Sequence, residues 1–428
     1  MSRHFPDWLA AFTETLTPKG EAPERFYFWS GVSTIAGVLR RRVFIDEGHF
    51  KHHPNFYIVL VGPPGLVKKS TTINIGANLL NTIPNVILGA DCATWQAFVE
   101  EVAAAQDLFA SGDVAVTNLV DQTHSVTCAL TLAISELGTF FDPNDHMMVN
   151  VMTELYDGKD NPFRKRTKTM GEDEIRSPFV NIIAGTTPDW IHANFRGRFG
   201  GWGLSSRIIF LHCDEKERDV PFPHELWQGT FDATMERFRD DLIAISKLQG
   251  TCTYAPAAKD FYRELYGNHG RRQTLLNRNA HHDPWLSYYF ARKLDHVLKL
   301  AIVLSASRNH QLVITLEDMR DAAARCDQIE VELSKVFADK QSGSREVRLN
   351  KDVWNGIVNV IRHDGAMEQR QMWSFTSQFM TFGRAKELID QLIAGRWLIC
   401  ESSLEGVFYT FGENAPLPEE SLHLNAPL

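Results

Sequence analysis

The stretch 56–71 joins an apolar run to a glycine- and lysine-containing loop, and it carries the clearest candidate chemistry in the chain. FYIVLVG (56–62) is followed by PPGLV and KKST, with a helix expected from there on. Glycine lets backbone N–H groups approach phosphate, lysine neutralises phosphate oxygens, and a hydroxyl at a helix start ligates Mg²⁺. We therefore predict a site for ATP and Mg²⁺. Its candidate residues are Gly62, Pro63, Pro64, Gly65, Lys68, Lys69, Ser70 and Thr71.

The position of the lysine in this loop departs from the usual G-x-x-x-x-G-K-[ST] spacing. Lys68 has the normal distance from Gly62, but the residue after it is Lys69, which cannot ligate a metal. Taking Lys69 as the phosphate lysine gives the required Lys-Ser pair at the cost of one extra loop residue. Because Mg²⁺ needs an oxygen ligand next to the lysine, we favour Lys69 with Ser70 as the Mg²⁺ ligand. The alternative is a Gly/Pro turn with a solvated basic pair.

Two further apolar runs end in polar residues that suit ATP hydrolysis. LTLAISELG (130–138) ends in Ser135-Glu136, so Glu136 is the candidate base that polarises the attacking water. Ser135 stands where an aspartate is usual and would reach the Mg²⁺ shell only indirectly. FVNIIAGTT (179–187) ends in Thr186-Thr187, and Thr187 is the candidate sensor, on a strand expected between the other two in space. A capped strand end is the alternative interpretation.

An arginine before a later strand is the last candidate of this set. SSRIIF (205–210) places Arg207 directly before an apolar run, after a glycine-rich segment. An arginine donated to the γ-phosphate of a neighbouring subunit's ATP stabilises transition-state charge. We therefore list Arg207 as a candidate arginine finger, the alternative being a surface arginine at a strand start.

Length and composition place these motifs in a multi-domain chain. The 428 residues suffice for about two to three domains. The net charge of −9 leaves only local patches for nucleic acid, and six scattered cysteines fit reduced thiols in a cytosol. No run of about 18 apolar residues and no signal peptide is visible, so we expect a cytoplasmic protein with no membrane partner.

The pattern of apolar residues predicts an α/β fold in five regions. Residues 1–50 look helical, and 51–218 alternate short strands with helices, as in a mainly parallel sheet covered by helices. Residues 219–340 are mostly helical. Residues 348–412 read as three helices and a β-hairpin, which suggests a winged helix, and 413–428 read as a flexible tail.

The order of the motifs resembles that of AAA+ ATPases of the hexameric helicase branch, and more narrowly of primase–helicase-like ATPases from phages and prophages. The resemblance covers about residues 25–215 and rests on FWSGVSTIAGVLRRRV, NFYIVLVGPPG with KST, AISELG, ELYDGKD, NIIAGTTPDWI and GGWGLSSRIIF. It implies a P-loop AAA+ core at 51–218, a helical lid at 219–340 and a hexameric homo-oligomer. It also makes Arg292, in RKLDHVLKLA, a candidate nucleotide contact, although a plain amphipathic helix is equally consistent.

In hexameric helicases, the interval between the acidic strand and the threonine strand carries a hairpin that enters the central channel. Here that interval is rich in basic residues, which would track a DNA backbone. The candidates are Arg164, Lys165, Arg166 and Lys168. The alternative is a solvated basic turn.

These expectations lead to one main hypothesis and two alternatives. The main one is a ring-forming, ATP-dependent DNA motor, a phage-type replicative helicase or translocase acting on single-stranded or forked DNA in the host cytoplasm. A separate primase or replication protein would then supply priming. The first alternative is a nucleotide-dependent loader or switch that unwinds nothing. The second is an ATPase in anti-phage defence.

Overall fold

The computed structural model describes residues 3–110, 124–167, 171–195, 203–278, 284–337, 343–377, 382–394, 396–403, 406–413 and 415. The chain divides into two compact units, Met1–Phe337 and Ala338–Leu428. The predicted N-terminal region, core and lid all belong to the first unit, because their helices share one hydrophobic core with the central sheet.

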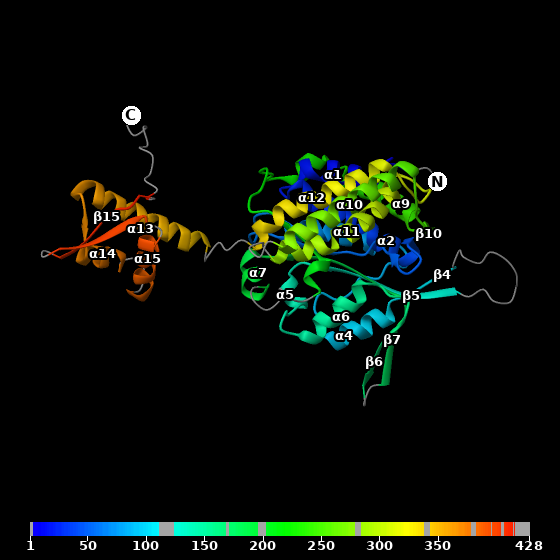
Figure 1. Cartoon of the computed structure of the whole chain (residues 1–428). Helices are drawn as coiled ribbons and strands as arrows, with labels where there is room; N and C mark the ends of the chain where they lie inside the picture. The colour runs from blue at the N-terminus through cyan, green and yellow to red at the C-terminus, as the bar shows by residue number, and fades with distance from the viewer. Residues whose placement is uncertain are drawn as a thin grey trace. The chain divides into compact units, whose positions relative to one another are not determined.

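A five-stranded sheet forms the centre of the first unit (Figure 1). Its order is β4 (Gln106–Ala110), β5 (His124–Ile134), β8 (Pro178–Thr186), β3 (Tyr57–Val61) and β9 (Ile208–His212). β5, β8, β3 and β9 are parallel, and β4 pairs antiparallel with β5 at the edge. Every residue of β3, β8 and β9 is buried, as expected for parallel strands covered on both faces. The predicted parallel sheet is confirmed, and β8 lies between β3 and β5 as expected.

Helices cover both faces of this sheet (Figure 1). α2 (Glu24–Leu39) and α3 (Lys69–Asn81) pack together and against β8 on one face. α4 (Trp95–Ala104) and α6 (His146–Tyr156) cover the other. α2 is buried from Phe26 to its end, which explains why its sequence is apolar all round.

The helices expected to form a lid pack directly on the rest of the first unit. α11 (Pro284–Arg308) lies along α12 (Leu316–Phe337), and α12 contacts the edge strand β9. α10 (Pro256–Arg278) contacts both of these helices, and α1 (Trp8–Leu16) packs on α2 and α11. The N-terminal helix and the lid are therefore continuous with the core of the sheet.

Apart from the fifteen-residue helix α9, the remaining elements of the first unit are short and complete its connections. They are η1 (Thr17–Lys19), η2 (Arg40–Arg42), β1 (Val43–Asp46), β2 (Lys51–His52), α5 (Leu137–Phe140), β6 (Phe163–Thr167), β7 (Gly171–Ile175), α7 (Pro188–Phe195), η3 (Ser205–Arg207), α8 (Pro223–Trp227), α9 (Phe231–Ile245), β10 (Gly250–Thr251), β11 (Thr253–Tyr254) and β12 (Val313–Ile314). β6 and β7 pair antiparallel as a hairpin. No described helix of either unit is long and apolar enough to cross a membrane.

The second unit has the order helix, short strand, two helices and hairpin. Its elements are α13 (Gly343–Asp364), β13 (Met367–Glu368), α14 (Gln369–Thr376), α15 (Phe382–Ala394), β14 (Leu398–Ser403) and β15 (Gly406–Phe411). The three strands form an antiparallel sheet in the order β13-β15-β14. Gly356 lets α13 approach α14, since a Cβ at this position would lie 2.1 Å from Cζ of Phe375.

Candidate functional site

The glycine-containing loop lies at the carboxyl ends of the parallel strands, between β3 and α3. The backbone N–H of Gly62 donates to the carbonyl of Thr186 at the end of β8 (3.2 Å). A Cβ at Gly62 would lie 2.5 Å from the carbonyl oxygen of Cys213, just beyond β9, so only glycine fits there. Gly65 adopts φ +72°, which glycine tolerates without a steric penalty. The loop is therefore seated over three neighbouring strand ends.

The two lysines of the loop point in different directions. Lys69 is 7% exposed, and its Nζ donates to the carbonyls of Gly62 (2.7 Å) and Pro63 (3.0 Å), so its ammonium lies under the loop. The side chain of Lys68 is 43% exposed, and its Nζ lies 3.2 Å from a carboxylate oxygen of Glu21. Lys68 precedes α3 in the left-handed conformation (φ 49°, ψ 39°), and this turn accommodates the extra loop residue.

The first turn of α3 offers hydroxyl groups next to Lys69. Ser70 and Thr71 are both exposed, whereas Thr72 is buried and its hydroxyl donates to the carbonyl of Lys68 (3.0 Å). The first backbone N–H groups of a helix lack intrahelical acceptors and carry partial positive charge. This helix start has the donors and hydroxyls that a phosphate with Mg²⁺ would need.

The ends of β5 and β8 bring an acid and a hydroxyl next to this loop. Glu136 is exposed, and its Oε1 accepts a hydrogen bond from Oγ1 of Thr186 (3.5 Å). Gly185 permits the close approach, because a Cβ there would lie 2.6 Å from the carbonyl oxygen of Ser135 and 3.5 Å from Cβ of Lys69. Burial lowers the pKa of Lys69, and the charge of Glu136 acts in the opposite direction. The lysine, the acid and the hydroxyl therefore share one edge of the sheet.

The threonine that faces Glu136 is Thr186, and the structure gives the predicted Thr187 another contact. The hydroxyl of Thr187 accepts from the backbone N–H of Trp190 (3.2 Å) at the start of α7, so it caps that helix. Thr186 is fully buried and is the last residue of β8. The sequence shows both threonines, but only the pairing of the strands selects between them.

Arg207 lies at the opposite edge of the sheet from the loop, directly before β9. It is buried, and its Nε and Nη2 donate to the two carboxylate oxygens of Asp157 (3.0 and 2.6 Å). Its Nη1 donates to the carbonyl of Gly203 (2.6 Å). Since this edge holds the amino ends of the strands, Arg207 cannot serve its own chain's loop. The guanidinium is enclosed within the chain, which differs from an arginine displayed for a neighbour.

Arg292 also lies at this amino edge and not beside the loop. Its guanidinium pairs with Asp295 one turn along α11 (3.0 Å) and lies 3.6 Å from Asp157. Asp157 thus connects Arg207 to Arg292. Sequence reasoning singled out the motif ELYDGKD but did not assign a role to this aspartate.

The basic hairpin β6–β7 exists, but one of its four predicted contacts is turned inwards. Lys165 is buried, and its Nζ lies 3.2 Å from Asp173, 3.5 Å from Glu100 and over the ring of Trp95. Arg164 is 61% exposed, with Glu174 at 3.5 Å. The side chain of Arg166 and all of Lys168 lie outside the described residues. Lys165 therefore anchors the hairpin to α4, and its role as a nucleic-acid contact stays a prediction.

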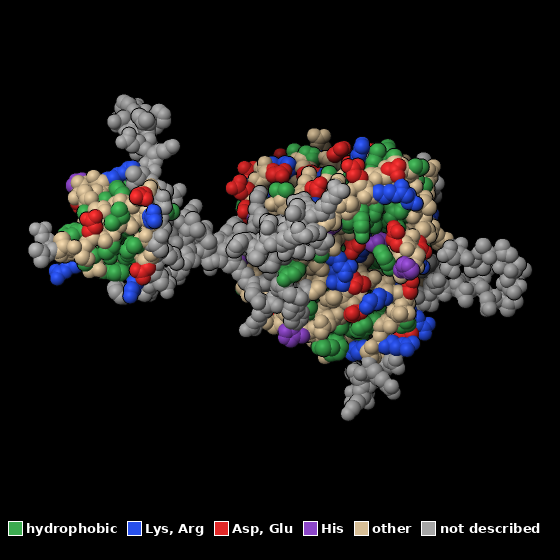
Figure 2. Space-filling model, viewed as in Figure 1, with side chains coloured by type: hydrophobic (Ala, Val, Ile, Leu, Met, Phe, Trp, Pro, Cys, Tyr) green, Lys and Arg blue, Asp and Glu red, His purple; other side chains and the backbone are tan. Residues whose placement is uncertain are grey.

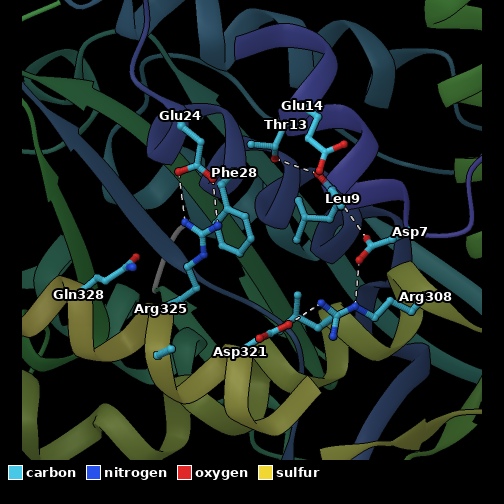
Figure 3. A pocket seen from close by; sticks show the side chains of 13 residues that line it. Asp7, Leu9, Thr13, Glu14, Glu24, Phe28, Arg308, Asp321, Arg325 and Gln328 are labelled. Carbon is cyan, nitrogen blue, oxygen red and sulfur yellow. Dashed lines mark hydrogen bonds and ion pairs between the residues drawn. The ribbon is translucent and has the colours of Figure 1, made fainter. Parts of the chain in front are cut away.

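A cavity of about 530 Å³ between α1, α2, α11 and α12 is lined by charged residues, five of which form ion pairs with one another (Figure 3). Arg308 lies 2.9 Å from Asp7 and 2.6 Å from Asp321. Arg325 lies 2.9 Å from Glu24 on the same cavity. These ion pairs tie the N-terminal helices to the helical region, so we assign this cavity a structural role.

Comparison of the sequence with known proteins identifies no family and no relative. The chain matches no protein-family model and no curated protein. Among the described residues, no group of three or more His, Cys, Asp or Glu side chains could hold a metal ion. The argument for function therefore rests on the loop and its neighbours at the carboxyl edge.

Proposed function

We propose that this chain is a P-loop ATPase of the AAA+ type that hydrolyses ATP with Mg²⁺. One observation carries the proposal: Lys69 lies under the loop, with Glu136 and Thr186 at the ends of the adjacent strands. A lysine with this contact exchanges loop carbonyls for phosphate oxygens when a nucleotide binds. The strand order, with β8 between β3 and β5, supports the same proposal.

Each residue at the carboxyl edge then has a defined task in hydrolysis. Lys69 and the N–H groups at the start of α3 bind the β- and γ-phosphates, and Ser70 ligates Mg²⁺. Mg²⁺, when bound, neutralises charge on these phosphates. Glu136 accepts a proton from the attacking water, and Thr186 holds the carboxylate of Glu136 in position. Ser135 supplies no carboxylate, so the Mg²⁺ shell depends on Ser70 and water.

The wider proposal is a DNA motor that acts as a homo-oligomeric ring, with a hexamer as the expected form. Arg207 would serve the ATP of a neighbouring subunit only after leaving Asp157, because the pair now encloses its guanidinium. The antiparallel sheet and helices of the second unit support a winged helix. Exposed Arg370, Lys386 and Arg396 there are available for a duplex or a protein partner.

The rate of ATP hydrolysis with and without single-stranded DNA tests this proposal. A motor shows turnover that DNA stimulates, and Arg207→Ala abolishes turnover while ATP still binds. The absence of an aspartate at Ser135 favours a second candidate, a nucleotide-dependent loader or switch. ATP binding without turnover, unaffected by DNA, would reject the motor and support the switch. Unchanged turnover in Arg207→Ala would remove Arg207 from the mechanism.

A further inference from the structure

A second cavity opens at the amino edge of the sheet, at the other end of β3 from the loop. It has a volume of about 380 Å³ and lies between the segment before β3, the residues after α6, and α11. Asn55 fixes one wall, because its Nδ2 donates to the carbonyls of Tyr156 (2.9 Å) and Val180 (3.3 Å). This cavity therefore lies at the opposite edge of the sheet from the loop and cannot share a ligand with it.

The lining of this cavity favours an anion. Four of its side chains are Lys or Arg and two are Asp; the cations are Lys51, Lys159, Arg292 and Lys299. The two carboxylates already have partners, since Asp157 accepts from Arg207 and Asp295 lies 3.0 Å from Arg292. Figure 2 shows Lys and Arg, acidic and His side chains interspersed on the face that carries α10 and α11. Three of the four cations have carboxylate neighbours, since Arg292 lies 3.0 Å from Asp295, Lys159 lies 2.7 Å from Glu154 and Lys51 lies 3.9 Å from Asp160. Lys299 is the lining cation without an ion pair among the described residues.

Two buried side chains of this cavity are candidates to contact a ligand, Lys299 because it has no ion pair and His53 because it has no hydrogen bond among the described residues. Lys299 is 5% exposed and donates to the carbonyl (3.2 Å) and Oδ1 (2.8 Å) of Asn55, and among the described residues it forms no ion pair. Its ammonium lies 3.8 Å from the ring centre of Tyr156. His53 is 4% exposed, and neither of its ring nitrogens has a hydrogen-bond partner among the described residues. Buried polar groups are normally paired, so the two ring nitrogens of His53 indicate a missing ligand.

An aromatic cavity of about 410 Å³ adjoins the cationic one and shares Phe50, His52 and Asp295 with it. Tyr262 and Tyr266 from α10 also line it. Phe50 is 58% exposed and Tyr266 is 63% exposed, which is unusual for rings of this size. Exposed aromatic rings beside cations are the features that bind a base and its phosphate.

We propose that these adjoining cavities form a second nucleotide-binding site, separate from the loop at residues 62–69. The phosphate would enter the cationic cavity beside Lys51 and Lys299, and the base would stack against Phe50 and Tyr266. His53 would complete the phosphate contacts, because a neutral imidazole can donate its one N–H to a phosphate oxygen. The bound group is either a free mononucleotide or one nucleotide of a single strand, since both present the same chemistry.

The test uses the full-length Lys69→Ala chain, in which nucleotide binding at the loop is weakened. Binding of a fluorescent AMP analogue and of a labelled oligo(dT) is measured by anisotropy. We expect one of these probes to bind, with Lys51→Ala and Tyr266→Ala, each added to Lys69→Ala, weakening its affinity at least tenfold. Arg263→Ala is the matched control, because this arginine lies on α10 and is 65% exposed without lining either cavity.

The two probes distinguish the source of the nucleotide. Binding of the AMP analogue that unlabelled AMP displaces identifies a free mononucleotide, and binding of oligo(dT) alone identifies a single strand. Because Lys51 and Tyr266 are partly exposed, we expect their variants to fold normally. Unchanged thermal unfolding of these variants would exclude a folding defect as the cause of weaker binding. The proposal is overturned if neither probe binds, or if Lys51→Ala and Tyr266→Ala bind as tightly as Arg263→Ala. A failure of the loop proposal has a different signature, namely that Lys69→Ala leaves ATP binding intact.

Discussion

Replacing each lysine of the loop in turn measures which of the two neighbours binds phosphate. Lys69 is buried and its Nζ lies 2.7 Å from the carbonyl of Gly62, whereas Lys68 extends towards Glu21. A charge-assisted hydrogen bond contributes about 1.5–3 kcal/mol. At about 1.4 kcal/mol for each factor of ten, Lys69→Ala should weaken ATP binding by about 10- to 100-fold.

The same reasoning gives a small effect for Lys68. Its contact with Glu21 is a partly exposed ion pair, and such pairs contribute about 0–1 kcal/mol. Lys68→Ala should therefore change the affinity for ATP by less than about fivefold.

Isothermal titration calorimetry with ATP and Mg²⁺ measures both affinities directly. Lys69→Met is the matched control, because it keeps an apolar stem of similar length under the loop without the charge. It should lose affinity as Lys69→Ala does, while thermal unfolding of the two variants stays close to that of the parent chain. The reasoning is refuted if Lys68→Ala weakens ATP binding more than Lys69→Ala does.

Three further outcomes follow from the described contacts. Glu136→Gln should slow ATP hydrolysis by about 10²- to 10⁴-fold with ATP affinity retained, and an unchanged rate would exclude Glu136 as the base. Asp107 is buried between Arg40 (2.8 Å) and Arg42 (2.6 Å). Asp107→Ala leaves these arginines without their carboxylate, so it should lower the free energy of unfolding, measured by urea denaturation, by about 3–5 kcal/mol. A loss below about 1 kcal/mol would contradict this expectation. Burial lowers the pKa of His296 to about 4. Between about pH 6.5 and 4, His296 is therefore protonated in the unfolded chain but neutral in the folded chain. Stability should fall as pH drops from about 6.5 to 4, and melting curves of His296→Phe should show a smaller fall; an identical pH dependence would show that other groups cause it.

Much of the central sheet could be predicted from the sequence because its strands are buried on both faces. FYIVLVG and FVNIIAGTT are continuous apolar runs, and runs of this kind between helical segments predict parallel strands. The region boundaries expected near residues 50 and 218 do not separate compact units in the structure. Composition changes there, but α2 and α12 pack into the same core as the sheet.

The candidate site was only partly predictable, since side-chain direction depends on residues far away in the chain. Arg207 is enclosed by Asp157, 50 positions earlier. Lys165 turns inwards because Glu100 provides a carboxylate from α4. Neither partner could be assigned from spacing, because the contacts exist only after the helices have packed on the sheet.

The sequence by itself determined the order of the motifs. It also showed that polar residues, such as Glu136 and Thr186, stand at the carboxyl ends of the predicted strands. It left open the choice between Lys68 and Lys69, and it favoured Thr187 over Thr186. Tertiary structure directed Lys69 under the loop and Thr186 towards Glu136, because the parallel strands end side by side at one edge. Tertiary structure alone also assembled the cavities at the amino edge, whose residues come from segments that share no sequence motif.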